Sequence, residues 1–410
     1  MKLDVFTRLG VIPPNKKITF YIFLLVPLIY PIVVLCLKYS GDMPYLFMPN
    51  DFQAYYFSSQ LFFKDIESLY YNPGFFMPYR YFPISPILHF MYGIFPYDTA
   101  YIVGLFLIYF QTVLVFLLVL KIAKEYFNHD DKEFLWLFWA IGLIVIVPYN
   151  IILYLQIQTS ISVMLTILLG YYYFKKEENE FRNNLIGGIF IAVAILLKPT
   201  IIIVLPFLID AIIDNEKIVI RTSSFLRIVP TIIMLIINII IFIAFPTLLY
   251  GFFQNNFHHI YIEFNYLSDS LTTFLARIFN IHPTILFLII CGTLFSILYY
   301  HFLTKKNDLI YYLALSILIS LISYIDVWNH SILFFLPLIM FIIMKTKSQE
   351  DKSKLKMIYY ITIGLSYLNV FNFYFSVNIF QVYYSLFTIY YPILFYYMYN
   401  KCHPSSFYVD

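Results

Sequence analysis

Apolar residues in this chain gather in long blocks, and the polar residues gather in short segments between the blocks. Many blocks approach the roughly 20 residues that an α-helix needs to cross a ~30 Å hydrocarbon core. Only helices of this kind satisfy their own backbone hydrogen bonds in lipid. The pattern therefore predicts twelve membrane-spanning helices, at 18–37, 99–120, 133–149, 153–174, 184–198, 200–213, 228–248, 284–303, 309–325, 330–344, 357–371 and 382–400.

The composition agrees with a protein embedded in lipid. Of 410 residues, 61% are hydrophobic and 12% are charged, whereas a soluble domain is roughly 25% charged. We therefore expect an all-α membrane protein in which residues 1–410 form a single polytopic membrane domain. The net charge of +3 is small, so attraction to nucleic acid is not indicated.

The basic residues predict the orientation of the chain. With both termini in the cytoplasm, 21 of the 26 Lys and Arg residues fall on the cytoplasmic side, as the positive-inside rule requires. These are Lys2, Arg8, Lys16, Lys17, Lys121, Lys124, Lys132, Lys175, Lys176, Arg182, Lys217, Arg221, Arg227, Lys305, Lys306, Lys345, Lys347, Lys352, Lys354, Lys356 and Lys401. The exceptions are Lys38, Lys64, Arg80, Lys198 and Arg277. We expect a multi-pass protein of the cell membrane with its active site on the extracytoplasmic side.

The first predicted non-cytoplasmic loop, 38–98, is rich in aromatic residues and proline. Tyr and Phe at this density suit the membrane interface, so we expect short interfacial helices there. Asp51 opens the helical pattern of 51–63 and has two interpretations. It can cap that helix, or it can act as a general base beside Tyr55.

A second feature is the pair Lys198-Pro199, which divides a run of about thirty apolar residues into two short pieces. A proline in the first turn of a new helix would leave free amide groups beside the Lys198 ammonium. Such a site would hold a phosphate. The alternative is a tight hairpin whose lysine reaches for the membrane surface.

The second predicted non-cytoplasmic loop, 249–283, contains His258 and His259 and also Arg277. Adjacent histidines on a helix point about 100° apart, which argues against one shared metal ion. A guanidinium near the outer leaflet can bind a phosphate through two hydrogen bonds. The three cysteines show no CxxC spacing. We expect no cofactor, although a divalent metal stays open.

Two further polar groups lie near predicted outer helix ends. Trp328 and His330 follow Asp326 at the outer junction of two spans. Trp328 can serve as an interface anchor, or this group can bind a sugar or phosphate. Gln156 lies near the outer start of the fourth span, where polar groups contact other helices or line a cavity.

The order of these features resembles the polytopic GT-C glycosyltransferases, most closely glycosyltransferase family 87, which includes polyprenyl-phosphate-mannose-dependent mannosyltransferases. Each motif is short, but their shared order along the first 340 residues carries the resemblance. The matching residues are Asp51-Phe52, Leu69-Tyr70, Tyr81-Phe82-Pro83, Gln156, Gly187-Gly188, Lys198-Pro199 and Trp328-Asn329-His330. The middle outer loop departs from the family pattern, because extra residues separate Asn265 from Arg277.

The resemblance implies an inverting transfer of a hexose, mannose in the named members, from a polyprenyl-phosphate sugar to a glycolipid or glycan acceptor. It implies that Asp51 is the base and that Lys198 and His330 stabilise the leaving phosphate. Charge placement adds Arg80 and Arg277 to the phosphate-binding set. Aromatic and amide character adds Tyr55, Gln156 and Trp328 to the substrate-binding set.

Two other classes share the twelve predicted spans. A transporter or lipid-linked sugar flippase would have a similar broken helix, but no inverted repeat is visible and few charges lie at the midplane. A polymerase or ligase for surface polysaccharide is a third class, against which only the order of the motifs speaks. The partners expected on the leading interpretation are the lipid donor, the acceptor and membrane lipid.

Overall fold

The computed structural model describes residues 16–40, 51–71, 79–127, 131–146, 154–214, 217–257, 268–304, 308–325, 327, 329–375 and 386–401. Within these residues the chain is helical apart from one two-stranded hairpin, as expected for the helical class. The chain divides into two compact units. The first comprises 1–169, 196–199 and 232–256, and the second comprises 170–195, 200–231 and 257–410. The prediction of one membrane domain stays a prediction.

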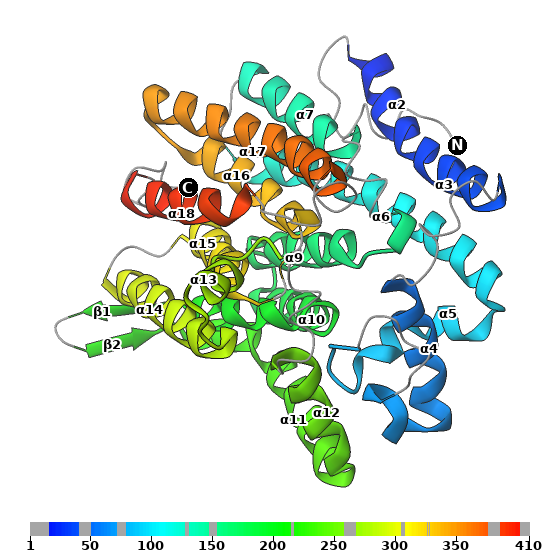
Figure 1. Ribbon diagram of the computed structural model, residues 1–410. Helices are drawn as coiled ribbons and strands as arrows, with labels where there is room; N and C mark the ends of the chain where they lie inside the picture. Colours follow the sequence, from blue (N-terminus) through cyan, green and yellow to red (C-terminus); the bar gives the residue numbers. More distant parts are fainter. Residues whose placement is uncertain are drawn as a thin grey trace. The chain divides into compact units, whose positions relative to one another are not determined.

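The helices of the first unit include one long apolar element at its start, which α2, η1 and α3 make up together (Figure 1). Short helices then follow in the predicted outer loop. The elements are α2 (Lys17–Leu25), η1 (Val26–Leu28), α3 (Ile29–Ser40), α4 (Asp51–Lys64), η3 (Ile66–Tyr70), η4 (Ser85–His89), α5 (Phe90–Ile94), α6 (Tyr97–Tyr126), α7 (Asp131–Ile146), most of α9 (Ser160–Phe174) and α11 (Val229–Ala244), and α12 (Pro246–Phe257).

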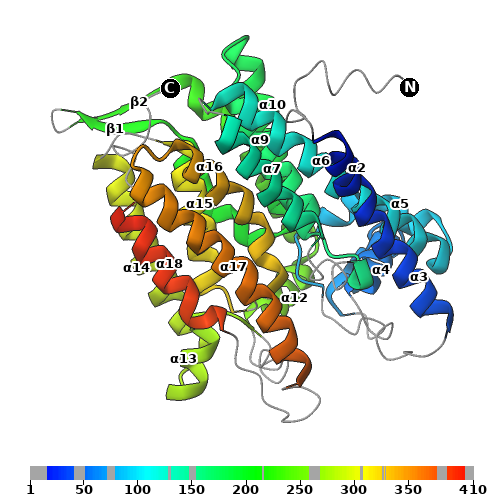
Figure 2. The same cartoon turned by 90° about the horizontal axis from the view of Figure 1, so that it is seen from above.

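The second unit contains most of α10 and η5 and the later elements other than α11 and α12. Its elements are α10 (Glu180–Leu197), η5 (Pro199–Leu208), β1 (Ala211–Asp214), β2 (Lys217–Ile220), η6 (Thr222–Arg227), α13 (Leu271–Phe279), α14 (Pro283–Thr304), α15 (Leu309–Ser323), η9 (Asn329–Phe334), α16 (Leu336–Lys345), α17 (Gln349–Phe375) and α18 (Phe387–Lys401). Helix α15 is buried along its length and packs against α14, α16 and α18. Figure 2 shows α16, α17 and α18 running side by side.

Four helices in the part of the chain that the structure describes are long and apolar enough to cross a membrane: Lys17–Ser40, Tyr97–Tyr126, Glu180–Leu197 and Pro283–Thr304. The bent pair α11 and α12 makes a fifth if it is counted as one span. Each of the twelve predicted ranges overlaps a helix. The number of spans stays a prediction, because several of these helices are shorter than a bilayer is thick.

The predicted span at 200–213 differs from the structure. The chain there forms the 3-10 helix η5 and then enters strand β1, which pairs antiparallel with β2 from Ala211 opposite Ile220 to Asp214 opposite Lys217. Pro206 lies inside η5 and has no backbone N–H to donate. The β-branched residues that follow suit a strand as well as a helix. Apolar content alone does not separate these outcomes.

The predicted span at 228–248 also ends early. Helix α11 stops at Ala244, and α12 starts at Pro246 after a bend of 114°. Proline disfavours a helical conformation in the residue before it and suits the first turn of a new helix, so Phe245-Pro246 breaks the run. As a result, α12 occupies the start of the predicted outer loop 249–283.

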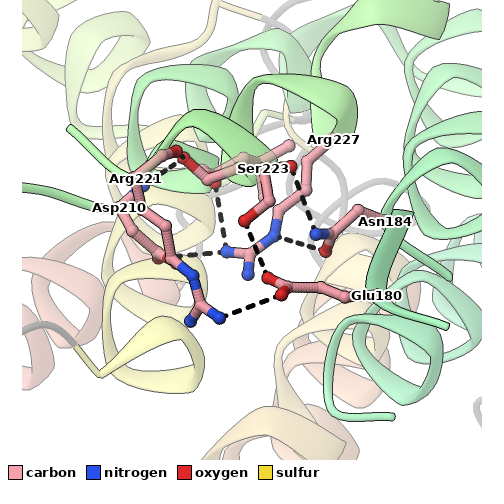
Figure 3. Close-up of polar contacts among 8 residues, drawn as sticks. Glu180, Asn184, Asp210, Arg221, Ser223 and Arg227 are labelled. Atoms are coloured by element: carbon pink, nitrogen blue, oxygen red, sulfur yellow. Dashed lines mark hydrogen bonds and ion pairs between the residues drawn. The ribbon is translucent and has the colours of Figure 1, made fainter. Parts of the chain in front are cut away.

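A polar cluster in the second unit joins α10, η5 and η6 (Figure 3). The buried Arg227 guanidinium donates to Asn184 Oδ1 at 2.9 Å and to Asp210 Oδ1 at 3.0 Å. Arg221 pairs with Glu180 at 3.0 Å, and the Ser223 hydroxyl donates to the same carboxylate at 2.7 Å. Two cations face two carboxylates, so the cluster carries no net charge, and its hydrogen bonds tie α10 to η6 and its flanking residue Arg221.

A second internal ion pair locks α15 to α16. Asp308 caps α15 by accepting from the Tyr311 N–H at 3.3 Å, and its other oxygen receives a hydrogen bond from Lys345 Nζ at 2.7 Å. The side chains are only 7% (Lys345) and 13% (Asp308) exposed. Removing one member of such a pair leaves the other charge buried without compensation.

We therefore predict that Lys345→Met lowers the thermal unfolding midpoint of the detergent-purified protein by several degrees, since breaking a buried pair costs about 3–5 kcal/mol. Tryptophan fluorescence during heating measures the effect. Lys354→Met is the matched control, because Lys354 pairs with Glu350 on an exposed surface and such pairs add little stability. Equal midpoints for the two variants would contradict the assignment.

Candidate functional site

Asp51 is the first residue of α4, and the rest of that helix is fixed by aromatic packing. Phe52 and Tyr55 are fully buried, and Phe52 contacts the rings of Tyr92 and Tyr101. A Cβ at Gly93 would lie 2.4 Å from Ser59 Oγ, so glycine permits the close approach of α5 to α4. The position of Asp51 is thus set by a rigid helix.

An irregular segment, Tyr79 to Ile84, carries Arg80 and Tyr81 and leads into η4. The Tyr70 hydroxyl donates to the Tyr81 carbonyl at 2.6 Å. The Ser85 hydroxyl donates to the Leu196 carbonyl at 2.9 Å, close to Lys198 in the chain. All of these residues belong to the first unit.

Asp51, Arg80 and Lys198 form an electrostatic cluster. Burial raises the pKa of the Asp51 carboxyl to about 6, and the positive charges of Lys198 and Arg80 oppose this rise. Burial lowers the pKa of the Lys198 ammonium to about 8; the charge of Asp51 opposes this fall and that of Arg80 adds to it. The structure thus brings the predicted base into the field of two predicted phosphate ligands.

The central pair of charges is coupled without direct contact. Among the residues that the structure describes, Asp51 and Lys198 form neither a hydrogen bond nor an ion pair with each other or with another side chain. Both side chains are half-buried. The Asp51 carboxylate and the Lys198 ammonium can therefore both hydrogen-bond to a bound ligand. Their opposite charges favour a ligand that has an acidic or hydroxyl proton for Asp51 and a negative charge for Lys198.

Two tyrosines border the Asp51 carboxylate. The Tyr55 and Tyr81 hydroxyls lie 2.9 Å apart, and both interact with Thr159 and feel the Asp51 charge. Burial and Asp51 raise the pKa values of both phenols, so both stay neutral. The Tyr55 ring stacks on His89, with ring centroids 4.6 Å apart. Neutral hydroxyls of this kind can bind a sugar hydroxyl or a phosphate oxygen.

Gln156 lies in a strained turn just before Thr159. Ile157 has a φ of 49°, which a β-branched residue rarely adopts, and the turn lets Gln158 donate to Gln156 Oε1 at 3.1 Å. The Ile157 side chain fills a notch at Gly104, where a Cβ would lie 2.6 Å from its Cδ1. Strain held by such packing is common at functional sites.

The remaining predicted site residues lie elsewhere in the chain. Arg277 is in α13 and is half-buried, and His330 is in η9; both belong to the second unit. Trp328, His258 and His259 lie outside the described residues. Within the described ranges no group of three or more His, Cys, Asp or Glu side chains could hold a metal ion.

Sequence reasoning missed three asparagines that hold the irregular segment: Asn238, Asn255 and Asn256. Asn238 Oδ1 accepts from the Ile84 N–H at 3.1 Å, and the other two bind carbonyls of Tyr79 and Arg80. One signal was available, because Asn238 is the single polar residue in the apolar run Ile232–Ala244. A lone amide in such a run marks a buried polar partner.

Comparisons with known proteins identify no relative. The chain matches no protein family, no curated protein and no solved structure.

The coupling of Asp51 to Lys198 gives a direct prediction. A hydrophobic carbodiimide reacts with a protonated carboxyl, so labelling of Asp51, followed by peptide mass spectrometry, should fall as the pH rises, with a midpoint of about 6. Lys198→Met removes a positive charge that lowers this pKa, so the midpoint should move to higher pH. Lys38→Met is the control, since Lys38 pairs with Asp98. An unchanged midpoint in Lys198→Met would disprove the coupling.

Proposed function

We propose that the protein is a membrane glycosyltransferase of the inverting type that moves a hexose, mannose in the leading version, from a polyprenyl-phosphate sugar to a glycolipid or glycan acceptor. The observation that supports this most strongly is the cluster of Asp51, Lys198 and Arg80. A carboxylate of raised pKa lies within the field of two cations, and among the described residues it forms no ion pair with Lys198. Such a site suits a reaction in which a carboxylate accepts a proton from one reactant while negative charge develops on a leaving group beside the cations.

The proposed step is a single displacement at the anomeric carbon. The Asp51 carboxylate takes the proton of the acceptor hydroxyl, whose oxygen forms the new glycosidic bond. The bond between the anomeric carbon and the phosphate oxygen breaks, and its electron pair leaves with the polyprenyl phosphate. Attack opposite to the leaving group inverts the configuration. No further reactant is required.

The cations have the complementary role. Negative charge grows on the phosphate as the bond breaks, and preorganised donors in a site shielded from water stabilise such charge strongly. Lys198 and Arg80 would bind this phosphate. His330 and Arg277 belong to the second unit, and their part in phosphate binding stays a prediction from the sequence. Tyr55, Gln156 and Trp328 would contact the sugar or the acceptor. An Asp51 pKa of about 6 leaves the base ionised at neutral pH, yet more basic than an ordinary aspartate.

The membrane supplies the remaining context. In the proposed topology, about twelve spans place both termini in the cytoplasm of a cell-membrane protein and the cluster on the extracytoplasmic side. The helices α4, η3, η4 and α5 follow the first apolar helix and precede the second, as interfacial helices of that loop would. The isoprenoid tail of the donor would lie among the apolar helices.

A transporter or a lipid-linked sugar flippase is the alternative. The bend of 114° between α11 and α12 favours it, because broken helices also form transport sites. The transferase gives each member of the cluster a role, with Asp51 as the base and the two cations as ligands of the leaving phosphate. The two functions differ in one outcome, which is the formation of a new glycosidic bond.

The test is transfer of labelled sugar by the purified protein in detergent. We expect label from polyprenyl-phosphate mannose to enter a new lipid product when membrane glycolipids are supplied, and Asp51→Asn to lower the rate about 10²–10⁴-fold, the usual loss for a general base. Polyprenyl-phosphate glucose is tested in parallel, because the sugar is a proposal.

Asp65→Asn is the matched control in the same loop. Asp65 accepts a hydrogen bond from the Ser68 hydroxyl on the surface and takes no part in the cluster. It should retain full activity. Equal rates for wild type and Asp51→Asn would reduce Asp51 to a helix cap, and absence of transfer by folded protein with both donors would favour the transporter.

A further inference from the structure

The segment Tyr79 to Ile84 is irregular, yet successive backbone carbonyls in it accept hydrogen bonds. The Tyr79 carbonyl accepts from Asn255 Nδ2 at 3.0 Å, and the Arg80 carbonyl accepts from Asn256 Nδ2 at 3.2 Å. The Tyr81 and Phe82 carbonyls accept from the Tyr70 hydroxyl and the Ser85 N–H. Buried backbone groups need such partners. Here, two side chains of α12 donate the hydrogen bonds to the carbonyls on either side of the Arg80 Cα atom.

Those two side chains come from one helix that packs closely on the segment. Helix α12 contributes Leu248 to a buried cluster that also contains Tyr70 and Tyr79. A Cβ at Gly251 would lie only 2.6 Å from Tyr70 Cβ, so glycine allows the close approach. Asn255 also donates to the Tyr70 carbonyl at 3.2 Å. The asparagines therefore project from a firmly docked platform.

We propose that Asn255 and Asn256 are positioning residues, whose amides fix the backbone of Tyr79 and Arg80 and thereby hold the Arg80 guanidinium near Asp51 and Lys198. The hydrogen bonds alone support the claim that the two asparagines fix this backbone. The consequence for phosphate binding rests on the proposed function. The bend at Phe245-Pro246 has a role in this arrangement, because it turns α12 away from the direction of α11.

An amide suits this task better than a hydroxyl or a charged group. Asn256 Nδ2 carries two hydrogens, one for the Arg80 carbonyl and one for the Phe252 carbonyl of its own helix at 2.9 Å. The second bond fixes the rotamer from which the first is made. A carboxylate could donate neither bond, and an ammonium would add a third cation beside Arg80.

The test uses the protonation of Asp51 as a reporter of where Arg80 lies. Lys198, Arg80, Tyr55 and Tyr81 are the charged and titratable groups that interact with Asp51 among the described residues. Loss of the Asn256 amide would let Arg80 move away. The carbodiimide-labelling midpoint of Asp51 in Asn256→Ala should then rise by ~0.5 pH unit, the direction expected when a nearby cation withdraws.

A double-mutant cycle shows whether the effect runs through Arg80. Arg80→Met should itself raise the midpoint, and adding Asn256→Ala to it should cause no further rise. Asn256→Leu is a second variant of similar volume without a donor, and the same rise is expected. Asn400→Ala is the matched control. Asn400 makes the same bond within its helix, to the Tyr396 carbonyl at 2.9 Å, and among the described residues its amide binds no other segment.

Two results would overturn the proposal. One is an unchanged midpoint in both Asn256 variants, and the other is a rise that persists in full when Arg80 is already methionine. The labelling needs no sugar transfer, so it decides the positioning role even if the chain proves to have no transferase activity. If transfer occurs, Asn256→Ala should also raise the KM for the lipid donor more than it lowers kcat.

Discussion

The candidate site depends on the hydrogen bonds that an irregular backbone segment, Tyr79 to Ile84, makes with side chains of the apolar helices around it. Unpaired amide and carbonyl groups are costly wherever water is excluded. Here, Asn255, Asn256 and the Tyr70 hydroxyl occupy three successive carbonyls, and Asn238 accepts from the Ile84 N–H. Once these bonds exist, the segment has little freedom, and the direction in which Arg80 and Tyr81 leave the backbone is restricted.

The electrostatics follow from this constraint. Asp51 is held by the rigid helix α4, Lys198 directly follows α10, and the backbone of Arg80 is held by the asparagines. The three charges interact electrostatically, and Asp51 and Lys198 form no ion pair with each other. The contrast is the Arg227 cluster of the second unit, in which each cation has its own carboxylate. Paired charges of that kind stabilise a fold, whereas Asp51 and Lys198, which are coupled but form no ion pair among the described residues, favour a bound ligand.

The sequence predicted much of this arrangement but only in outline. Hydrophobic blocks located the helices, and charge placement with the motifs selected Asp51, Arg80 and Lys198, which the structure brings into one electrostatic cluster. The break at Phe245-Pro246 and the hairpin at Ala211–Ile220 were missed, because apolar content is the same in a span, a bent helix and a strand. Asn255 and Asn256 were missed because their partners are backbone carbonyls 176 residues away, which no local pattern records.

A cryo-electron-microscopy structure of the protein with a short-chain polyprenyl phosphate, the leaving group of the proposed reaction, tests the proposed site most directly. We expect the phosphate between the Lys198 ammonium and the Arg80 guanidinium, with the Asp51 carboxylate facing the position of the anomeric carbon. Phosphate density away from these three residues, in a complex saturated with the ligand, would contradict the proposal.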